Sequence, residues 1–270
     1  MTGHGRHRLL ACDLDGTLLD SDGRVTDAVS AALLRARDAG LALAVITARP
    51  RRDVAREVSS RVPGSAYWAY SNGAVIHGPG AAAPRRLVGF GPEEARRLVA
   101  AVGAAAAGWS CALDLVDRTV TIDPFPQEAS RHWNHVERRG ARAAGPFPEQ
   151  PVPKVLVHTG TVCDAAVVER VQRVVGPGAV ATASGGAFVE LVPPGTGKSE
   201  ALKWICAELA LEPPAAVAVG DGLNDLTMLR LAGLGAAPAN APAQVRLAAD
   251  LVLPSNDEDA VAALVALLLD

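Results

Sequence analysis

The sequence predicts an α/β fold in which a doubly wound parallel sheet is interrupted by an inserted α+β domain. Short apolar runs alternate with helical segments at both ends of the chain, as expected for parallel strands that helices cover on both faces. Three of these runs stop at, or just before, a small polar or acidic residue. Between the two ends, alternating strands and proline-rich stretches replace this pattern, which indicates a separate module.

The N-terminal segment is expected to contain three strands and two helices. Each strand is a continuous apolar run bounded by polar or turn-forming residues. Thr26 can cap the first helix, and Gly40 can end it in the left-handed conformation. The expected strands are 8–12, 41–46 and 67–70, and the expected helices are 27–39 and 53–62.

The inserted module begins at a Gly/Ala/Pro linker at 79–84, and the α/β pattern resumes after Gly185-Gly186. We therefore expect a Rossmann-like core at 1–78 and 186–270 and an inserted domain at 79–185. The inserted domain is expected to hold helices at 93–101 and 164–175 and strands at 111–116, 119–122, 154–158 and 179–183. The second core segment is expected to hold strands at 188–192 and 215–219 and helices at 199–210 and 224–231, with further elements to 269.

The composition is that of an ordinary globular protein, with 49% hydrophobic and 20% charged residues and a net charge of −3. Nucleic acid is disfavoured as a partner because no basic excess is available to neutralise phosphates. We expect no membrane span, because the first apolar run breaks at Asp13 and the last, at 261–269, is too short. The four cysteines lack Cys-x-x-Cys spacing, which favours a reduced, cytoplasmic protein.

Acidic residues converge on one edge of the expected sheet. Asp13 ends the first buried run, Thr47 ends the second, and Asp221 follows the run at 215–219. In a parallel sheet these positions lie at the carboxyl edge, where ligands bind. Asp15 and Asp225 add two more carboxylates, and such a group is unfavourable unless a cation joins it. Oxygen ligands favour magnesium over zinc, and together with Lys198 the site suits an anion such as phosphate.

These residues stand in four motifs: Asp13-Leu14-Asp15-Gly16-Thr17, Thr47, Lys198 and Gly220-Asp221-Gly222-Leu223-Asn224-Asp225. In order and spacing the motifs resemble those of the haloacid dehalogenase (HAD) superfamily of phosphatases. The inserted domain resembles the C2-type cap of that family. Four further segments resemble its Cof-type, C2B-capped branch: 18–26, 47–50, 71–74 and 240–241.

The resemblance implies a role for each motif residue. Asp13 would attack phosphorus and form an aspartyl-phosphate, while Asp15 would protonate the leaving alcohol and then activate water. Arg49, in Thr47-Ala48-Arg49, is a candidate substrate contact. The implied phosphate-binding residues are Thr47, Lys198 and Asn224, and the implied Mg²⁺ ligands are Asp13, Asp15, Asp221 and Asp225.

Two other motifs compete with this interpretation. Gly195-Thr196-Gly197-Lys198-Ser199 is similar to half of a nucleotide-binding P-loop, but Val192 stands where the first glycine is required. His132 and His135 have a spacing that can place two imidazoles on one helix face. We expect instead a surface helix there, with Trp133 packed beneath it.

Three functions remain open at this stage. The leading one is a magnesium-dependent phosphatase that acts on a small phosphorylated metabolite such as a sugar phosphate. A phosphomutase would use the same residues and return the phosphoryl group to a sugar hydroxyl, since the partition depends on how water is excluded. A non-catalytic binding module is disfavoured because all the catalytic side chains are present.

Substrate choice is expected to reside in the inserted domain. Its candidate polar residues are each expected to be solvated or to pack rather than to bind a ligand: Asp114, Asp117, Arg118, Lys154 and His158. The segment before Asn240 lacks the Val-Ala-Met-Gly of the family pattern, which leaves the role of Asn240 in a phosphate or loop contact open.

Overall fold

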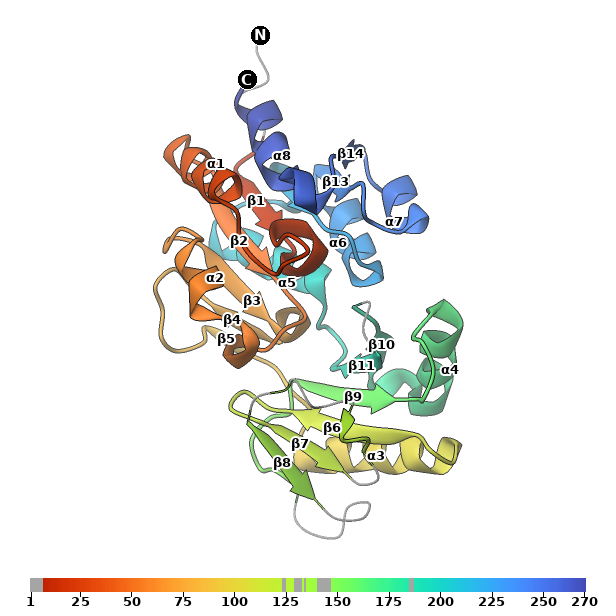
Figure 1. The fold of residues 1–270 in the computed structure, drawn as a ribbon. Helices are drawn as coiled ribbons and strands as arrows, with labels where there is room; N and C mark the ends of the chain where they lie inside the picture. Colours follow the sequence, from red (N-terminus) through yellow and green to blue (C-terminus); the bar gives the residue numbers. More distant parts are fainter. Residues whose placement is uncertain (1–6, 123–124, 129–132, 134, 140–146, 185–186) are drawn as a thin grey trace. The chain divides into compact units, whose positions relative to one another are not determined.

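The computed structural model describes residues 7–122, 125–128, 133, 135–139, 147–184 and 187–270. The chain forms two compact units (Figure 1), one of Met1–Ala48, Val54–Arg85 and Gly197–Asp270 and one of Arg49–Asp53 and Arg86–Thr196. The first unit is therefore built from both ends of the chain. Within the described ranges, no helix has both the length and the apolar character needed to cross a membrane.

The sheet of the first unit has its N-terminal strand at the centre. β1 (Leu9–Cys12) pairs in parallel with β2 (Ala42–Ile46) on one side and with β12 (Ala216–Val219) on the other. The full strand order is β14-β13-β12-β1-β2-β3-β4-β5. The remaining strands are β3 (Tyr67–Tyr70), β4 (Val75–His77), β5 (Arg86–Leu87), β13 (Leu234–Pro238) and β14 (Leu251–Leu253).

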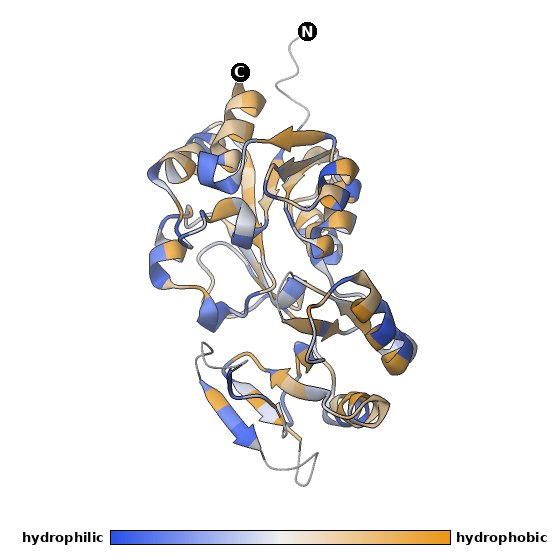
Figure 2. Cartoon of the chain, turned by 45° about the vertical axis from the view of Figure 1, so that its right-hand side comes forward, coloured by the Kyte–Doolittle hydropathy of each residue, from blue (hydrophilic) through white to orange (hydrophobic). Residues whose placement is uncertain are grey.

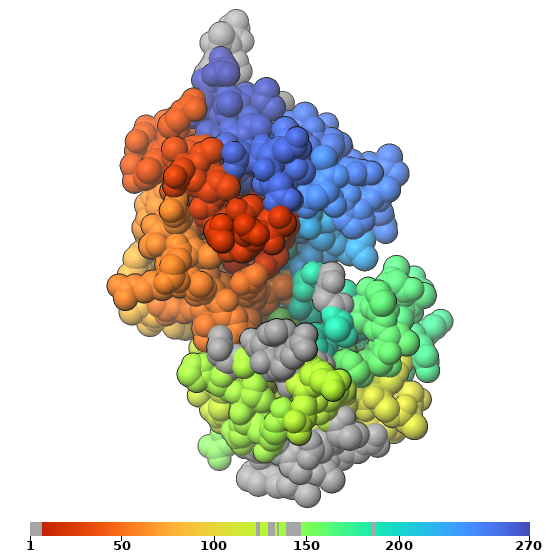
Figure 3. Space-filling model, viewed as in Figure 1, coloured from red at the N-terminus to blue at the C-terminus, as the bar shows by residue number. Residues whose placement is uncertain are grey.

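Helices cover both faces of this sheet, because alternate residues of each strand point to opposite sides. Leu10 and Cys12 pack with α1 (Asp27–Asp38) and α8 (Ala260–Leu269). Leu9 and Ala11 pack on the other side with α5 (Lys198–Glu208), α6 (Leu226–Leu231) and α7 (Ala243–Ala248). The central strands β1, β2 and β12 are accordingly apolar (Figure 2). The N- and C-terminal segments of this unit lie side by side (Figure 3).

The second unit is a six-stranded sheet with two helices on one face. Its strand order is β10-β11-β9-β6-β7-β8, antiparallel except for the pair β7 and β8. The face beneath the helices is apolar. The elements are α3 (Pro92–Ala105), β6 (Ser110–Asp114), β7 (Thr119–Ile122), β8 (Val136–Arg139), β9 (Lys154–His158), α4 (Ala165–Val175), β10 (Val180–Thr182) and β11 (Phe188–Val192).

Two features differ from the expectation. β11, which the sequence pattern assigned to the core, pairs with β10 and β9 in the second sheet, and the chain returns to the first unit at Gly197. The expected helix at 53–62 is only α2 (Arg56–Ser60), and Arg51–Asp53 is a separate helical turn that belongs to the second unit. Apolar runs alone do not reveal which of two sheets a strand joins, and this explains the first difference.

Candidate active site

Asp13 occupies the carboxyl end of the central strand. Its backbone N–H donates to the carbonyl of Val219 (2.9 Å), so the last residue of β12 fixes where the side chain begins. The chain then makes a wide turn over Leu14–Leu18, in which Gly16 has φ +69°. A Cβ on Gly16 would lie 2.4 Å from Oδ2 of Asp221, so glycine is required there for two reasons, the backbone angle and the close approach.

Two buried carboxylates and one partly buried carboxylate lie near one ammonium group in the first unit. Ligand atoms of Asp13, Asp221 and Asp225 all lie within 4.8 Å of one another. The Nζ atom of Lys198 is 2.6 Å from Oδ1 of Asp13 and 2.7 Å from Oδ1 of Asp225. The Thr17 hydroxyl donates to Oδ1 of Asp221 (2.9 Å).

The charges at this cluster do not balance. Burial, with Asp225 nearby, raises the pKa of Asp13 to about 7 even though Lys198 opposes the shift. Burial and the Asp13 carboxylate raise the pKa of Asp221 to about 6. Burial disfavours the charged form of Lys198, but its two carboxylate partners outweigh that effect and raise its pKa. The three carboxylates therefore carry more negative charge than the single ammonium group of Lys198 can neutralise. A divalent cation, which prefers oxygen ligands, would supply the missing positive charge.

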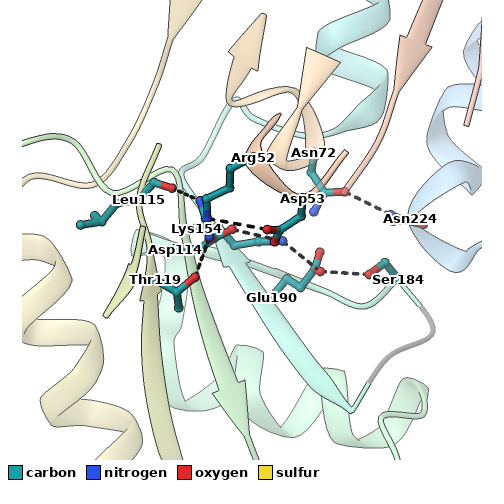
Figure 4. A network of polar contacts seen from close by, with 10 residues as sticks. All are labelled: Arg52, Asp53, Asn72, Asp114, Leu115, Thr119, Lys154, Ser184, Glu190 and Asn224. Carbon is teal, nitrogen blue, oxygen red and sulfur yellow. Dashed lines mark hydrogen bonds and ion pairs between the residues drawn. The ribbon is translucent and has the colours of Figure 1, made fainter. Parts of the chain in front are cut away.

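Thr47 and Asn224 reach the same edge through Asn72. The Thr47 N–H donates to the Ala69 carbonyl (2.8 Å), and the Thr47 carbonyl accepts from the Asn72 N–H (2.9 Å). The Asn72 side chain, which is buried, accepts from the Nδ2 amide of Asn224 (3.1 Å, Figure 4). Sequence reasoning gave Asn72 no role of its own. The sequence did hold a signal, because Ser71-Asn72-Gly73 follows an apolar run at the carboxyl edge, and asparagine and glycine tolerate the positive φ that both adopt here (56° and 87°).

The turn that carries Asp15 is anchored from the C-terminal part of the chain. Asp15 is half-buried, with extended φ and ψ of −75° and 130°. The side-chain amide of Asn240 donates to the Gly16 carbonyl (2.8 Å), and its oxygen accepts from the Asn256 N–H (2.9 Å). In the structure Asn240 thus holds a loop.

Arg49 belongs to the second unit, where its guanidinium donates to the Asp53 carbonyl (3.4 Å). Lys198 is the first residue of α5, directed at carboxylates rather than set behind a P-loop turn. His132 lies outside the described residues. The surface helix expected around it is not seen where the chain is described, because Trp133 and His135 are not helical and β8 begins at Val136.

Four of the five candidate polar residues of the second unit fall into two groups. Arg118 contacts Glu137 (2.8 Å) and Asp117 (2.7 Å), and all three are at least partly exposed. Asp114 and Lys154 are buried instead and belong to a charged network (Figure 4). In that network Arg52 donates to Asp114, to the Thr119 hydroxyl and to the Leu115 carbonyl, while Lys154 contacts Glu190 (3.2 Å).

The model of the haloacid dehalogenase-like hydrolase family matches residues 10–265. The chain belongs to this family. The resemblance seen in the motifs, including that to the Cof-type branch, is thereby confirmed. The fold class is confirmed as well, by solved structures that share it at low sequence identity. A protein of Streptococcus mutans UA159 superposes with a TM-score of 0.85 at 23% identity, covering 97% of this chain and 99% of its own. The HAD subclass IIB sugar phosphatase BT4131 gives a TM-score of 0.78 at 20% identity, covering 94% and 96%.

Curated relatives match this HAD chain to different extents. The chain covers 44% of the chloroplastic endoribonuclease YBEY of Arabidopsis thaliana, at 26% identity over 93% of its own length. It covers 32% of a phosphoglycolate phosphatase of Methanopyrus kandleri, at 44% identity over 27% of its own length. Two relatives are matched nearly throughout. The HMP-PP phosphatase of Cronobacter sakazakii is 27% identical over 88% of this chain and 86% of its own length. The 5-amino-6-(5-phospho-D-ribitylamino)uracil phosphatase YwtE of Bacillus subtilis is 27% identical over 94% of this chain and 96% of its own length.

Proposed function

We propose that this HAD hydrolase is a Mg²⁺-dependent phosphatase that hydrolyses a small phosphorylated metabolite through an aspartyl-phosphate. The observation that carries the proposal is the cluster of three carboxylates, of which the two buried ones, Asp13 and Asp225, pair with Lys198. A site with more carboxylates than ammonium groups attracts a cation. The cation and the ammonium group together then attract a phosphate. The names of the fully matched phosphatase relatives support the same reaction.

Each chemical step has a candidate residue. An oxygen of Asp13 forms a bond to phosphorus while the bond from phosphorus to the ester oxygen breaks, and Asp15 gives its proton to the departing alcohol. Water then attacks the phosphorus of the aspartyl-phosphate, Asp15 accepts the proton, and the carboxylate of Asp13 leaves. Lys198 offsets the charge of the phosphoryl oxygens and holds Asp13. Thr47 and Asn224 are the remaining candidates for contacts with the phosphoryl oxygens.

The metal is assigned to the acidic cluster. Asp13, Asp221 and Asp225 are the candidate side-chain ligands, with the backbone carbonyl of Asp15 as a fourth. When bound, Mg²⁺ supplies charge that screens the nucleophile from the negative phosphate. Gly16 and Thr17 shape the cluster for this purpose, because one permits the approach of Asp221 and the other donates to it.

The finer assignments are proposals as well. We propose that the substrate contains a sugar or a related polyol phosphate and that the second unit (the inserted cap domain) selects it. The phosphomutase alternative uses the same core residues and differs only in the final acceptor. Oxygen-18 from labelled water is expected in the released phosphate, whereas transfer to a second hydroxyl of the sugar would favour the mutase.

Replacing Asp13 by asparagine tests the reaction itself. The Asp13→Asn variant is expected to lose turnover of acetyl phosphate and of a sugar phosphate panel, because the amide is not a competent nucleophile. Asp38→Asn is the matched control, since Asp38 is an exposed carboxylate on α1. Circular dichroism should show both variants folded. Retained turnover in Asp13→Asn, or turnover that is insensitive to a chelator, would contradict the proposal.

A further inference from the structure

The sheet of the second unit has a second face with two distinct halves. Residues alternate along β9, so Val155 and Val157 lie in the core beneath the helices while Lys154, Leu156 and His158 lie on the other face. Lys154 begins one half, which is charged, and His158 begins the other, which is aromatic. Leu156 separates them.

The charged half is paired mostly within itself, and its two buried atoms without a hydrogen-bond partner among the described residues, Nε of Arg52 and Oδ1 of Asp53, lie 3.9 Å apart as an ion pair. Nζ of Lys154 lies 3.2 Å from Oε1 of Glu190 and 3.7 Å from Oδ2 of Asp114. The Ser184 hydroxyl donates to Oε1 of Glu190 (2.9 Å), and Arg52 binds Asp114 (Figure 4). Each acid here, Asp53 included, has a basic partner in Arg52 or Lys154, so the charged groups of this half are occupied with one another.

The aromatic half is a continuous group of rings. Phe125 stacks on Phe188 with centroids 5.9 Å apart and an interplanar angle of 17°. Trp133 lies 5.1 Å from Phe188 and 5.5 Å from Phe125, and His158 lies 5.9 Å from Phe188. Phe125 is buried, but Phe188, Trp133 and His158 retain exposed area. Aromatic side chains that are partly exposed in a group of this kind can stack with flat π-systems.

Two polar atoms beside these rings have no partner within the described residues. They are Nδ1 of His158 and Oγ of Ser110, and both are buried. The two residues face each other across β6 and β9 in the antiparallel register, and Ser110 as a whole is only 4% exposed. A hydroxyl can donate and accept, and a neutral imidazole does one or the other at each nitrogen. Burial also lowers the pKa of His158, which favours the neutral ring. Buried polar groups without partners are uncommon in folded proteins, so these two indicate a ligand that supplies the partners.

We propose that this face of the second unit binds a planar, nitrogen-containing ring carried by the leaving group of the substrate. The ring stacks on Phe188 and Trp133, and its polar edge exchanges hydrogen bonds with Ser110 and His158. The inference rests on the proposed phosphatase function and narrows it, since the substrate becomes a sugar or polyol phosphate that bears such a ring. The hydroxyls of a bare sugar phosphate could pair with the two polar atoms, but such a substrate offers no flat π-system to stack on the rings.

Matched substrate pairs test this proposal. Uridine 5′-monophosphate differs from ribose 5-phosphate by the ring on the sugar, and flavin mononucleotide differs from ribitol 5-phosphate in the same way. The wild-type protein is expected to have a kcat/KM about 5- to 100-fold higher for at least one ring-bearing ester than for its partner. The Phe188→Leu and Ser110→Ala variants should each lower this ratio. Phe147→Leu, which alters a ring in the apolar core beneath the helices, should keep the wild-type ratio.

Binding of the dephosphorylated products separates this proposal from the phosphatase function. Calorimetry with uridine and riboflavin should detect binding to the wild-type protein, weakened in Phe188→Leu and unchanged in Phe147→Leu, while ribose and ribitol should bind more weakly. Failure to hydrolyse any ester, acetyl phosphate included, with ring binding intact would refute the phosphatase function alone. The proposal for this face would be overturned if kcat/KM were equal within both substrate pairs and no ring bound. It would also be overturned if Phe188→Leu left the ratio of kcat/KM between the ring-bearing ester and its partner unchanged.

Discussion

Replacing Lys198 by methionine removes the ammonium group from the carboxylate cluster while retaining a similar length of apolar side chain. Nζ of Lys198 pairs with Asp13 at 2.6 Å and with Asp225 at 2.7 Å, and its side chain is only 1% exposed. The variant therefore leaves two carboxylates buried without their cation, beside a third from Asp221. Removing one partner of a buried ion pair typically costs about 3–5 kcal/mol.

The same helix offers a matched control. Lys203 is 50% exposed and pairs with Glu200 one turn away on α5. An exposed pair of this kind contributes up to about 1 kcal/mol, so Lys203→Met should change the free energy of unfolding little.

Urea unfolding in a chelator measures both variants. Lys198→Met is expected to lose about 3–5 kcal/mol, and a double variant with Asp225→Asn should recover part of the loss because one buried charge is gone. Turnover by Lys198→Met should fall by about 100-fold or more, as for loss of a preorganised electrostatic contact. A loss of stability no larger than that of Lys203→Met would refute the reasoning about the cluster.

Three further predictions follow from the same structure. Millimolar Mg²⁺ should raise the melting temperature of the metal-free protein, because it neutralises the buried carboxylates; no change in a thermal scan would argue against a cation at the cluster. Gly16→Ala should abolish turnover, because the added methyl group would lie 2.4 Å from Asp221. Gly23→Ala is the control and should retain turnover, because Gly23 also has a positive φ but has open space around it. Equal activities of the two variants would contradict the close approach of Gly16 to Asp221. Leu264→Ala in α8 should lower the free energy of unfolding, measured in urea, by about 2–5 kcal/mol because Leu264 is buried. Leu267 is 63% exposed, so Leu267→Ala should lower it by about 0.5 kcal/mol or less. Similar losses in the two variants would contradict the assignment of Leu264 to the core.

The core of the fold was predictable because its signals are local. A buried parallel strand is a short apolar run, and its carboxyl end is marked by the polar residue that follows, as at Asp13 and Thr47. The convergence of Asp13 with Asp221 followed from the rule for parallel sheets, and the structure brings their carboxylates together. The assignment of roles to these residues remains a proposal.

The remaining features depend on pairings between distant residues, which no local pattern contains. β11 has the same apolar run as a core strand, and only its antiparallel partners place it in the second sheet. Arg52 stands three residues after Arg49 in an arginine-rich loop, and the sequence does not show that its partner is Asp114, far along the chain. His158 was expected to be solvated or to pack, and its unpartnered nitrogen becomes visible only when β6 is placed beside it.

The central position of β1 has a consequence for how the chain is made. Leu9 pairs with Ala216, so one edge of the strand that carries Asp13 has no partner until β12 has been synthesised. At ordinary translation rates the intervening chain takes roughly 10 to 40 s to emerge. The second unit is nearly all contiguous, from Arg86 to Thr196, and can fold on the ribosome during this interval. An apolar strand edge meanwhile stays open to wrong pairings, and chaperones that shield the nascent N-terminal segment should therefore raise the yield of the folded protein.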